Sequence, residues 1–112
     1  MKKFFILFTI AGVFVFSACS HKNSAAKVKP TTYNDVMPIF QAKCGPCHLP
    51  SKGGNKHNLE LYATTLKLGA DILKRVEMEP TQRGFMPMRN PKLAEPELAV
   101  IRKWVADGLL EK

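Results

Sequence analysis

Two cysteines and one histidine lie within five positions of each other, in the segment CGPCH from Cys44 to His48. The chain of 112 residues contains only one more cysteine. A cluster of this kind can form a disulfide, a dithiol redox site, part of a zinc site, or a site where haem is attached through thiols. Because each of these uses requires a different fold around the cluster, the rest of the sequence has to distinguish between them.

The first eighteen residues have the pattern of a secretory signal. Lys2 and Lys3 precede fifteen uncharged residues, 4–18, which match the charged and apolar regions of such a signal. A transmembrane helix needs about 20 apolar residues, so this run is short for a membrane span. We therefore predict that residues 1–18 direct export and form no part of the folded domain.

The end of this signal, FSAC (Phe16 to Cys19), resembles the lipobox of bacterial lipoproteins. In that family the cysteine receives a diacylglyceryl thioether and becomes the new N-terminus. The resemblance implies that Cys19 is lipidated and that Ser20 directs the protein to the outer membrane, where the domain faces the periplasm of the cell envelope. Phe16 departs from the aliphatic residue that the family prefers, and an ordinary cleavage site beside a chance cysteine is the alternative.

Residues 19–112 are enough for one small domain. The small, polar and basic residues at 19–30 predict a flexible tether, which places the folded domain at 31–112. The formal net charge of +8 falls to +6 when Lys2 and Lys3 are removed with the signal. The remaining cations are scattered and no nucleic-acid-binding motif accompanies them, so we expect a basic surface that assists docking and no nucleic-acid partner.

Helical spacing of apolar residues begins near Thr31. The segment TYND, residues 32–35, matches a helix-capping signature. The residues after it form one helical face, at Val36, Ile39, Phe40 and Lys43. Pro38 lacks the backbone N–H that a helix interior uses, so we expect either a kink or a helix that begins at Pro38.

Two further helical segments are expected. Residues 59–77 predict one or two short helices, with Gly69 as a boundary, and with buried positions at Leu66, Ile72, Leu73 and Val76. Residues 96–108 predict a last helix between Pro96 and Gly108, with core positions at Leu98, Ile101, Trp104 and Val105. No stretch alternates over strand length, so the domain is predicted to be all-α.

Segments rich in proline and glycine separate these helices. Residues 48–58 predict a loop, and residues 78–96, with four prolines and no apolar period, predict a long segment without regular structure. In small domains, long segments of this kind are usually functional or disordered. The methionines within this segment are therefore candidates for a functional role.

The all-α prediction separates the four uses of the cluster. A dithiol site of the thioredoxin type requires a strand before its cysteines, and no strand is predicted. A zinc site requires four ligands, whereas only His57 lies near the cluster. A disulfide between Cys44 and Cys47 leaves His48 without a role. The pattern Cys-x-x-Cys-His matches covalent haem attachment, in which both thiols form thioethers and the histidine binds iron, so haem is the best supported of the four.

Residues 31–109 resemble a small bacterial class I cytochrome c domain. The resemblance rests on the segments YNDVMPIFQAKCGPCH (33–48), FMPM (85–88) and LAEPELAVIRKWVADG (93–108). In this family a first helix leads into the haem motif, a loop methionine is the sixth iron ligand, and a last helix packs across the first. Gly53 and Gly54 resemble loop positions that let the backbone pass close to the haem. The resemblance implies one covalent haem c held by Cys44, Cys47, His48 and Met86, with His48 and Met86 as its iron ligands.

The sixth ligand is predicted to be Met86. It resembles the Met-Pro pair of the family, and Pro87 favours an extended backbone at Met86. The alternatives are Met88, Met78, His57 and an open coordination site. A thioether favours reduced iron, so ligation by methionine and histidine predicts a raised reduction potential.

The resemblance implies an electron carrier rather than an enzyme. With both axial positions filled, iron changes its oxidation state without binding a substrate. We expect a monomer whose partners are redox proteins, acidic ones included. Two alternatives stay open: a haem-based sensor of small ligands, which requires a weak or absent sixth ligand, and a fixed haem subunit of a membrane redox complex.

Overall fold

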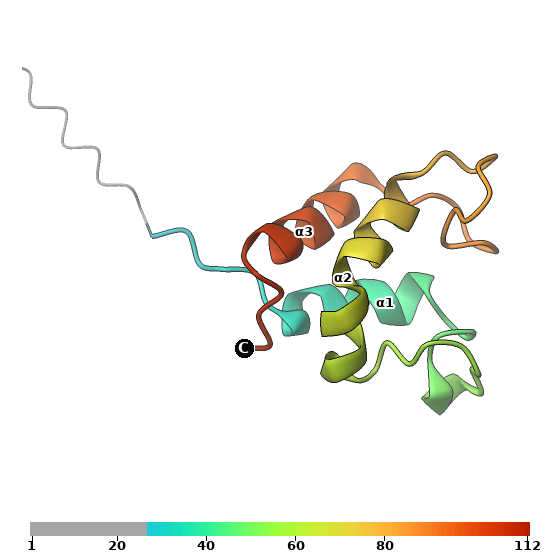
Figure 1. Ribbon diagram of the computed structural model, residues 1–112, viewed down its shortest axis with the longest axis horizontal. Coiled ribbons are helices and arrows are strands. Elements are labelled where there is room, and N and C mark those ends of the chain that lie inside the picture. The colour runs from blue at the N-terminus through green and yellow to red at the C-terminus, as the bar shows by residue number, and fades with distance from the viewer. Residues whose placement is uncertain (1–26) are drawn as a thin grey trace, which may run out of the picture.

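The computed structural model describes residues 27–112, which contain three α-helices and one short 3₁₀ turn, η1 (Pro50–Lys52) (Figure 1). The predicted signal at 1–18 and the predicted lipidation site Cys19 lie outside the described residues, as does most of the predicted tether. No helix within the described part is long and apolar enough to cross a membrane.

Helix α1 (Tyr33–Lys43) begins where the capping signature predicted it. The Asp35 carboxylate accepts hydrogen bonds from the backbone N–H of Thr32, at 2.8 Å, and from the Thr32 hydroxyl, at 3.0 Å. These bonds lower the pKa of the Asp35 carboxyl. Pro38 occupies an exposed position inside the helix, so the alternative that the helix begins at Pro38 is wrong. The cap engages a free amide of the first turn, and the helix therefore starts before the proline.

Helix α2 (Tyr62–Glu77) is one continuous helix, and the prediction of a boundary at Gly69 is wrong. Gly69 is buried, and a methyl group there would lie 2.4 Å from Cδ2 of Leu109. Close packing against the C-terminal segment offsets the helix-propensity cost of glycine, about 1 kcal/mol relative to alanine. Leu66, predicted to be buried, is 43% exposed, because the inward face of α2 carries the small residues Thr65 and Gly69 instead.

Helix α3 (Glu95–Ala106) contacts both α1 and α2, and the core lies between the three helices (Figure 1). The ring of Trp104 packs edge-on against Phe40, with 6.2 Å between ring centroids. The predicted core positions that are buried include Val36, Phe40, Val76, Leu98, Ile101 and Trp104. Half-buried against the same core lie Ile39, Ile72, Leu73 and Val105. The spacing of apolar residues therefore predicted the inward faces of α1 and α3 correctly.

The start of α1 and the C-terminal segment lie side by side (Figure 1). The N–H of Tyr33 donates to the carbonyl of Leu110 at 2.7 Å, and Thr32 forms an isolated β-bridge with Leu110. No strand occurs within residues 27–112 beyond this bridge, which confirms the all-α prediction for the part of the chain that is described.

Residues 78–94 connect α2 to α3 without a helix or strand, as the prolines predicted. The segment extends past the end of α2 and returns to the start of α3 (Figure 1). At its base, Arg102 of α3 pairs with Glu77, at 2.5 Å, and also with Glu95. The two ends of the segment are thereby held at neighbouring helix ends.

Candidate functional site

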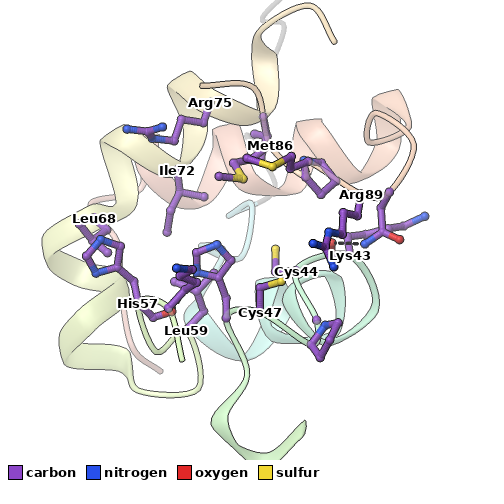
Figure 2. A pocket seen from close by; sticks show the side chains of 18 of the residues that line it. Lys43, Cys44, Cys47, His57, Leu59, Leu68, Ile72, Arg75, Met86 and Arg89 are labelled. Atoms are coloured by element: carbon purple, nitrogen blue, oxygen red, sulfur yellow. Dashed lines mark hydrogen bonds between the residues drawn. The ribbon is translucent and has the colours of Figure 1, made fainter. Parts of the chain in front are cut away.

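The side chains of the cysteine and histidine cluster line a cavity of about 530 Å³ (Figure 2). Residues of the turn after α1, of α2 and of the segment 78–94 form its walls. These walls are mostly apolar and include Leu59, Leu68, Ile72 and Val76. Cavities of about 300–1,000 Å³ with apolar walls are typical of small-molecule and cofactor sites.

A tight turn at the end of α1 brings the three predicted side chains to this cavity. The N–H of Cys44 still donates to the carbonyl of Phe40, at 2.9 Å, so the cysteine directly continues the helix. The N–H of His48 donates to the carbonyl of Cys44 at 3.1 Å and closes the turn. Cys44, Cys47 and His48 consequently all line the same cavity. This placement lets the three side chains contact a single ligand.

The state of the two thiols bears on the four uses of the cluster. Cys44 and Cys47 are free rather than joined in a disulfide. Burial raises the pKa of the Cys44 thiol to about 11, so this thiol is protonated near neutral pH in the unliganded protein. Within residues 27–112, no group of three or more histidine, cysteine or acidic side chains is close enough to hold a metal ion.

His48 is oriented by a backbone carbonyl. Its Nδ1 lies 3.0 Å from the carbonyl oxygen of His57, and because a carbonyl only accepts, Nδ1 carries the proton. The lone pair of the ring is then on Nε2. A hydrogen bond of this kind sets the tautomer and ring orientation of histidines that bind metals, and it raises their basicity.

Met86 reaches the cavity from the segment 78–94. In Figure 2 its side chain lies across the cavity from Cys44 and Cys47. Its N–H donates to the carbonyl of Arg75 at 3.2 Å, and Phe85 beside it is buried. The structure therefore brings Met86 to the same cavity as the cluster, although 38 positions separate its number from that of His48.

The other candidate ligands differ in their placement. Met88 also lines the cavity but is 74% exposed. His57 lines the cavity as well, and its carbonyl already holds His48. Met78 is not among the residues of the cavity walls. Of the methionines that reach the cavity, Met86 is the more enclosed.

Cationic side chains surround the cavity. Lys43, Lys56, Arg75 and Arg89 line it, against the single carboxylate of Asp71. Arg75 pairs with Asp71 at 2.6 Å, and Lys43 lies 3.5 Å from Glu97. Among the described residues, Lys56 and Arg89 form no ion pair, so they contribute most of the positive charge at the cavity mouth.

Several residues of the cavity were not predicted from the sequence. Leu68 and Ile72 lie four positions apart. This spacing predicts that they share one face of a helix, but it does not predict what that face packs against. Arg75 follows on the same helix, and Asn90 carries no sequence signal at all. Only the packing of α2 and of segment 78–94 around the cluster assigns these four residues to the cavity.

Gly54 packs closely against the backbone of the turn that carries the cysteines. A methyl group at Gly54 would lie 2.1 Å from the carbonyl oxygen of Pro46 and 2.6 Å from that of Cys47. Neither Gly54 nor Gly53 lines the cavity, so the expectation that these glycines let backbone pass close to a cofactor is not supported. Gly54 instead lets the following loop pack against the turn itself.

We expect Gly54→Ala to lower the free energy of unfolding by about 3 kcal/mol, the upper end of the range for overpacking, because the clashing atoms belong to the backbone. Gly53→Ala is the matched control. Gly53 has a φ of 81° with open space around it, so alanine there costs about 1 kcal/mol through backbone strain alone. Urea unfolding of both variants measures the difference, and equal losses would contradict the role of Gly54.

Comparisons with protein-family models, with curated proteins and with solved structures find no match for this chain. The residues of the cavity therefore define what it can bind. Its walls are mostly apolar, the turn contributes two thiols and one imidazole, and segment 78–94 contributes the thioethers of Met86 and Met88.

Proposed function

We propose that this protein is a monohaem c-type cytochrome that transfers single electrons between redox partners at the bacterial cell envelope. One observation carries the proposal. A single apolar cavity gathers the whole Cys-x-x-Cys-His motif together with Met86 from a distant segment, and these are the groups that a covalently attached, six-coordinate haem needs.

The residues fit this cofactor in their chemistry. Cys44 and Cys47 are free thiols, and each S–H can add across a vinyl double bond of haem to form a thioether without an oxidant. His48 presents Nε2 as a ligand because the His57 carbonyl holds Nδ1–H. Met86 offers a soft thioether. When bound, haem supplies an iron centre that takes up and releases one electron.

The chain sets the properties of that centre through its ligands and walls. Thioether ligation by Met86 favours the reduced state and raises the reduction potential. The cavity walls are mostly apolar, and Leu59 and Val76 among them are buried. A hydrophobic shell of this kind also tunes the reduction potential. The hydrogen bond to His48 makes the imidazole a stronger donor and fixes the plane of its ring.

The test of the proposal is the optical spectrum of the purified protein, expressed with the bacterial haem attachment machinery and recorded oxidised and reduced. A six-coordinate c-type spectrum that interconverts between the two states supports it. Failure to change oxidation state would refute electron transfer. Lipidation of Cys19 belongs to the same proposal, since it keeps the domain at the outer membrane, and the intact mass of the mature N-terminus tests it.

The cations at the cavity mouth suit an acidic redox partner. Steering by charge raises association rates by roughly 10- to 1,000-fold at low salt, and exposed charges are screened beyond about 8–10 Å at ordinary salt. We expect the rate of electron exchange with an acidic redox protein to fall as salt rises, and Lys56→Gln with Arg89→Gln to lower the low-salt rate about 10-fold. Stopped-flow oxidation across ionic strength measures both effects.

Lys74→Gln is the control for this experiment, because Lys74 is an exposed residue of α2 away from the cavity walls. It removes one positive charge without changing the cavity mouth. A rate that does not depend on salt would argue against electrostatic docking and favour the alternative of a fixed subunit in a larger redox complex.

A further inference from the structure

The segment that carries Met86 is tied to α2 on one side. Arg75 donates from Nη1 to the carbonyl of Gly84, at 3.3 Å, and its own carbonyl accepts the N–H of Met86, at 3.2 Å. The guanidinium is held in turn by Asp71, at 2.6 Å from Nε. Gly84 and Met86 are therefore both hydrogen-bonded to one residue of α2, the helix that forms one wall of the cavity.

A second tie joins the same segment to the end of α1. Nδ2 of Asn90 donates to the carbonyl of Lys43 at 2.7 Å, across 47 positions of sequence (Figure 2, dashed line beside Lys43). Lys43 is the last residue of α1, and the carbonyls at the end of a helix receive no hydrogen bond from within the helix. It is also the residue before Cys44, so the bond connects the methionine segment directly to the turn of the haem motif.

We propose that Asn90 is a positioning residue for the Met86 ligand, an inference that rests on the proposed function. Arg75 and Asn90 hold the segment at both sides of Met86, and both of them line the cavity. The tie at Asn90 sets how far Met86 stands from the turn that carries His48. It also holds the segment so that Met86 is enclosed while Met88 stays 74% exposed.

A merely structural role for Asn90, as a cap on α1, predicts different behaviour. Loss of a cap lowers stability but leaves the iron ligands unchanged in molecules that are folded. Loss of a positioning residue frees the sixth coordination site in folded molecules. Binding of carbon monoxide to the reduced protein separates the two, because carbon monoxide competes with the methionine for that site.

The experiment compares Asn90→Ala and Asn90→Asp with wild type as holoproteins. Aspartate has the shape of asparagine but, when ionised, lacks the N–H donor. We expect both variants to keep covalent haem, to show a weaker sulfur-to-iron absorption band, and to bind carbon monoxide about 2- to 10-fold more tightly, as the loss of one hydrogen bond predicts. Amide exchange in peptides covering residues 84–90 should also become faster.

Gln82→Ala is the matched control. Gln82 lies in the same segment, and its side chain also bonds to backbone, the N–H of Glu79 at 2.7 Å, but it does not line the cavity. We expect its carbon monoxide affinity and absorption band to equal those of wild type. An equal change in Gln82→Ala would show general loosening of the segment and overturn the inference.

The remaining outcomes separate this inference from the proposed function. Asn90 variants that carry haem and bind carbon monoxide as wild type does would overturn the positioning role alone. A wild-type protein without covalent haem would overturn both. Should Asn90→Ala fail to fold, Asn90→Asp is the variant that decides, since it leaves no cavity where the side chain was.

Discussion

A variant with Cys44→Ser and Cys47→Ser is expected to lose its haem-stained band completely on a denaturing gel. Denaturation breaks the bonds between iron and its ligands, so only haem attached through thioethers stays with the chain. Serine lacks the sulfur that adds to a vinyl group but is close to cysteine in size. Staining of wild type and variant, expressed together with the bacterial haem attachment machinery, measures the effect.

Each single variant serves as the control for the double one. Cys44→Ser and Cys47→Ser alone each keep one thiol at the cavity, so we expect a weaker band rather than none. A wild-type chain that is folded but unstained would refute covalent attachment. Detection of zinc or of a dithiol–disulfide couple in place of haem would instead support one of the alternative uses of the cluster.

Met86→Ala is expected to open the sixth coordination position. The oxidised variant should lose the sulfur-to-iron band, and its reduction potential should fall, because the soft thioether no longer favours reduced iron. The affinity of the reduced form for carbon monoxide should rise about 10- to 1,000-fold. This range follows if wild type exposes its iron in only about 0.1–10% of molecules at any moment.

Met88→Ala is the matched control for Met86, since both methionines line the cavity but Met88 is mostly exposed. We expect its spectrum and carbon monoxide affinity to stay at the wild-type values. If Met88→Ala alone lost the band, Met88 would be the ligand. If wild type itself bound carbon monoxide readily, a sensor of small ligands would replace the electron carrier as the better description.

Charges near the cavity connect these experiments to partner choice. The ties at Arg75 and Asn90 hold the methionine segment in place, while Lys56 and Arg89 form no ion pair among the described residues. Different side chains of the cavity thus position the proposed ligand and attract the proposed partner. The ligand experiments and the salt experiment can therefore give independent answers.

Local interactions explain what could be predicted from the sequence alone. The start of α1 follows from a hydrogen bond between Thr32 and Asp35, three positions apart. The inward face of α3 follows from the helical spacing of Leu98, Ile101 and Trp104, all of which are buried. The Cys-x-x-Cys-His motif needs no distant contact to be recognised, because its members share a single turn.

Contacts between distant segments decided the rest. Gly69 stays inside one continuous α2 because Leu109 packs against it, and Leu66 of the same helix is exposed. The sequence determined that two methionines stand near each other in an irregular segment. Only the tertiary structure decided that Met86 is the enclosed one, because hydrogen bonds that join its segment to Arg75 of α2 and, through Asn90, to Lys43 of α1 set the path of the backbone around it.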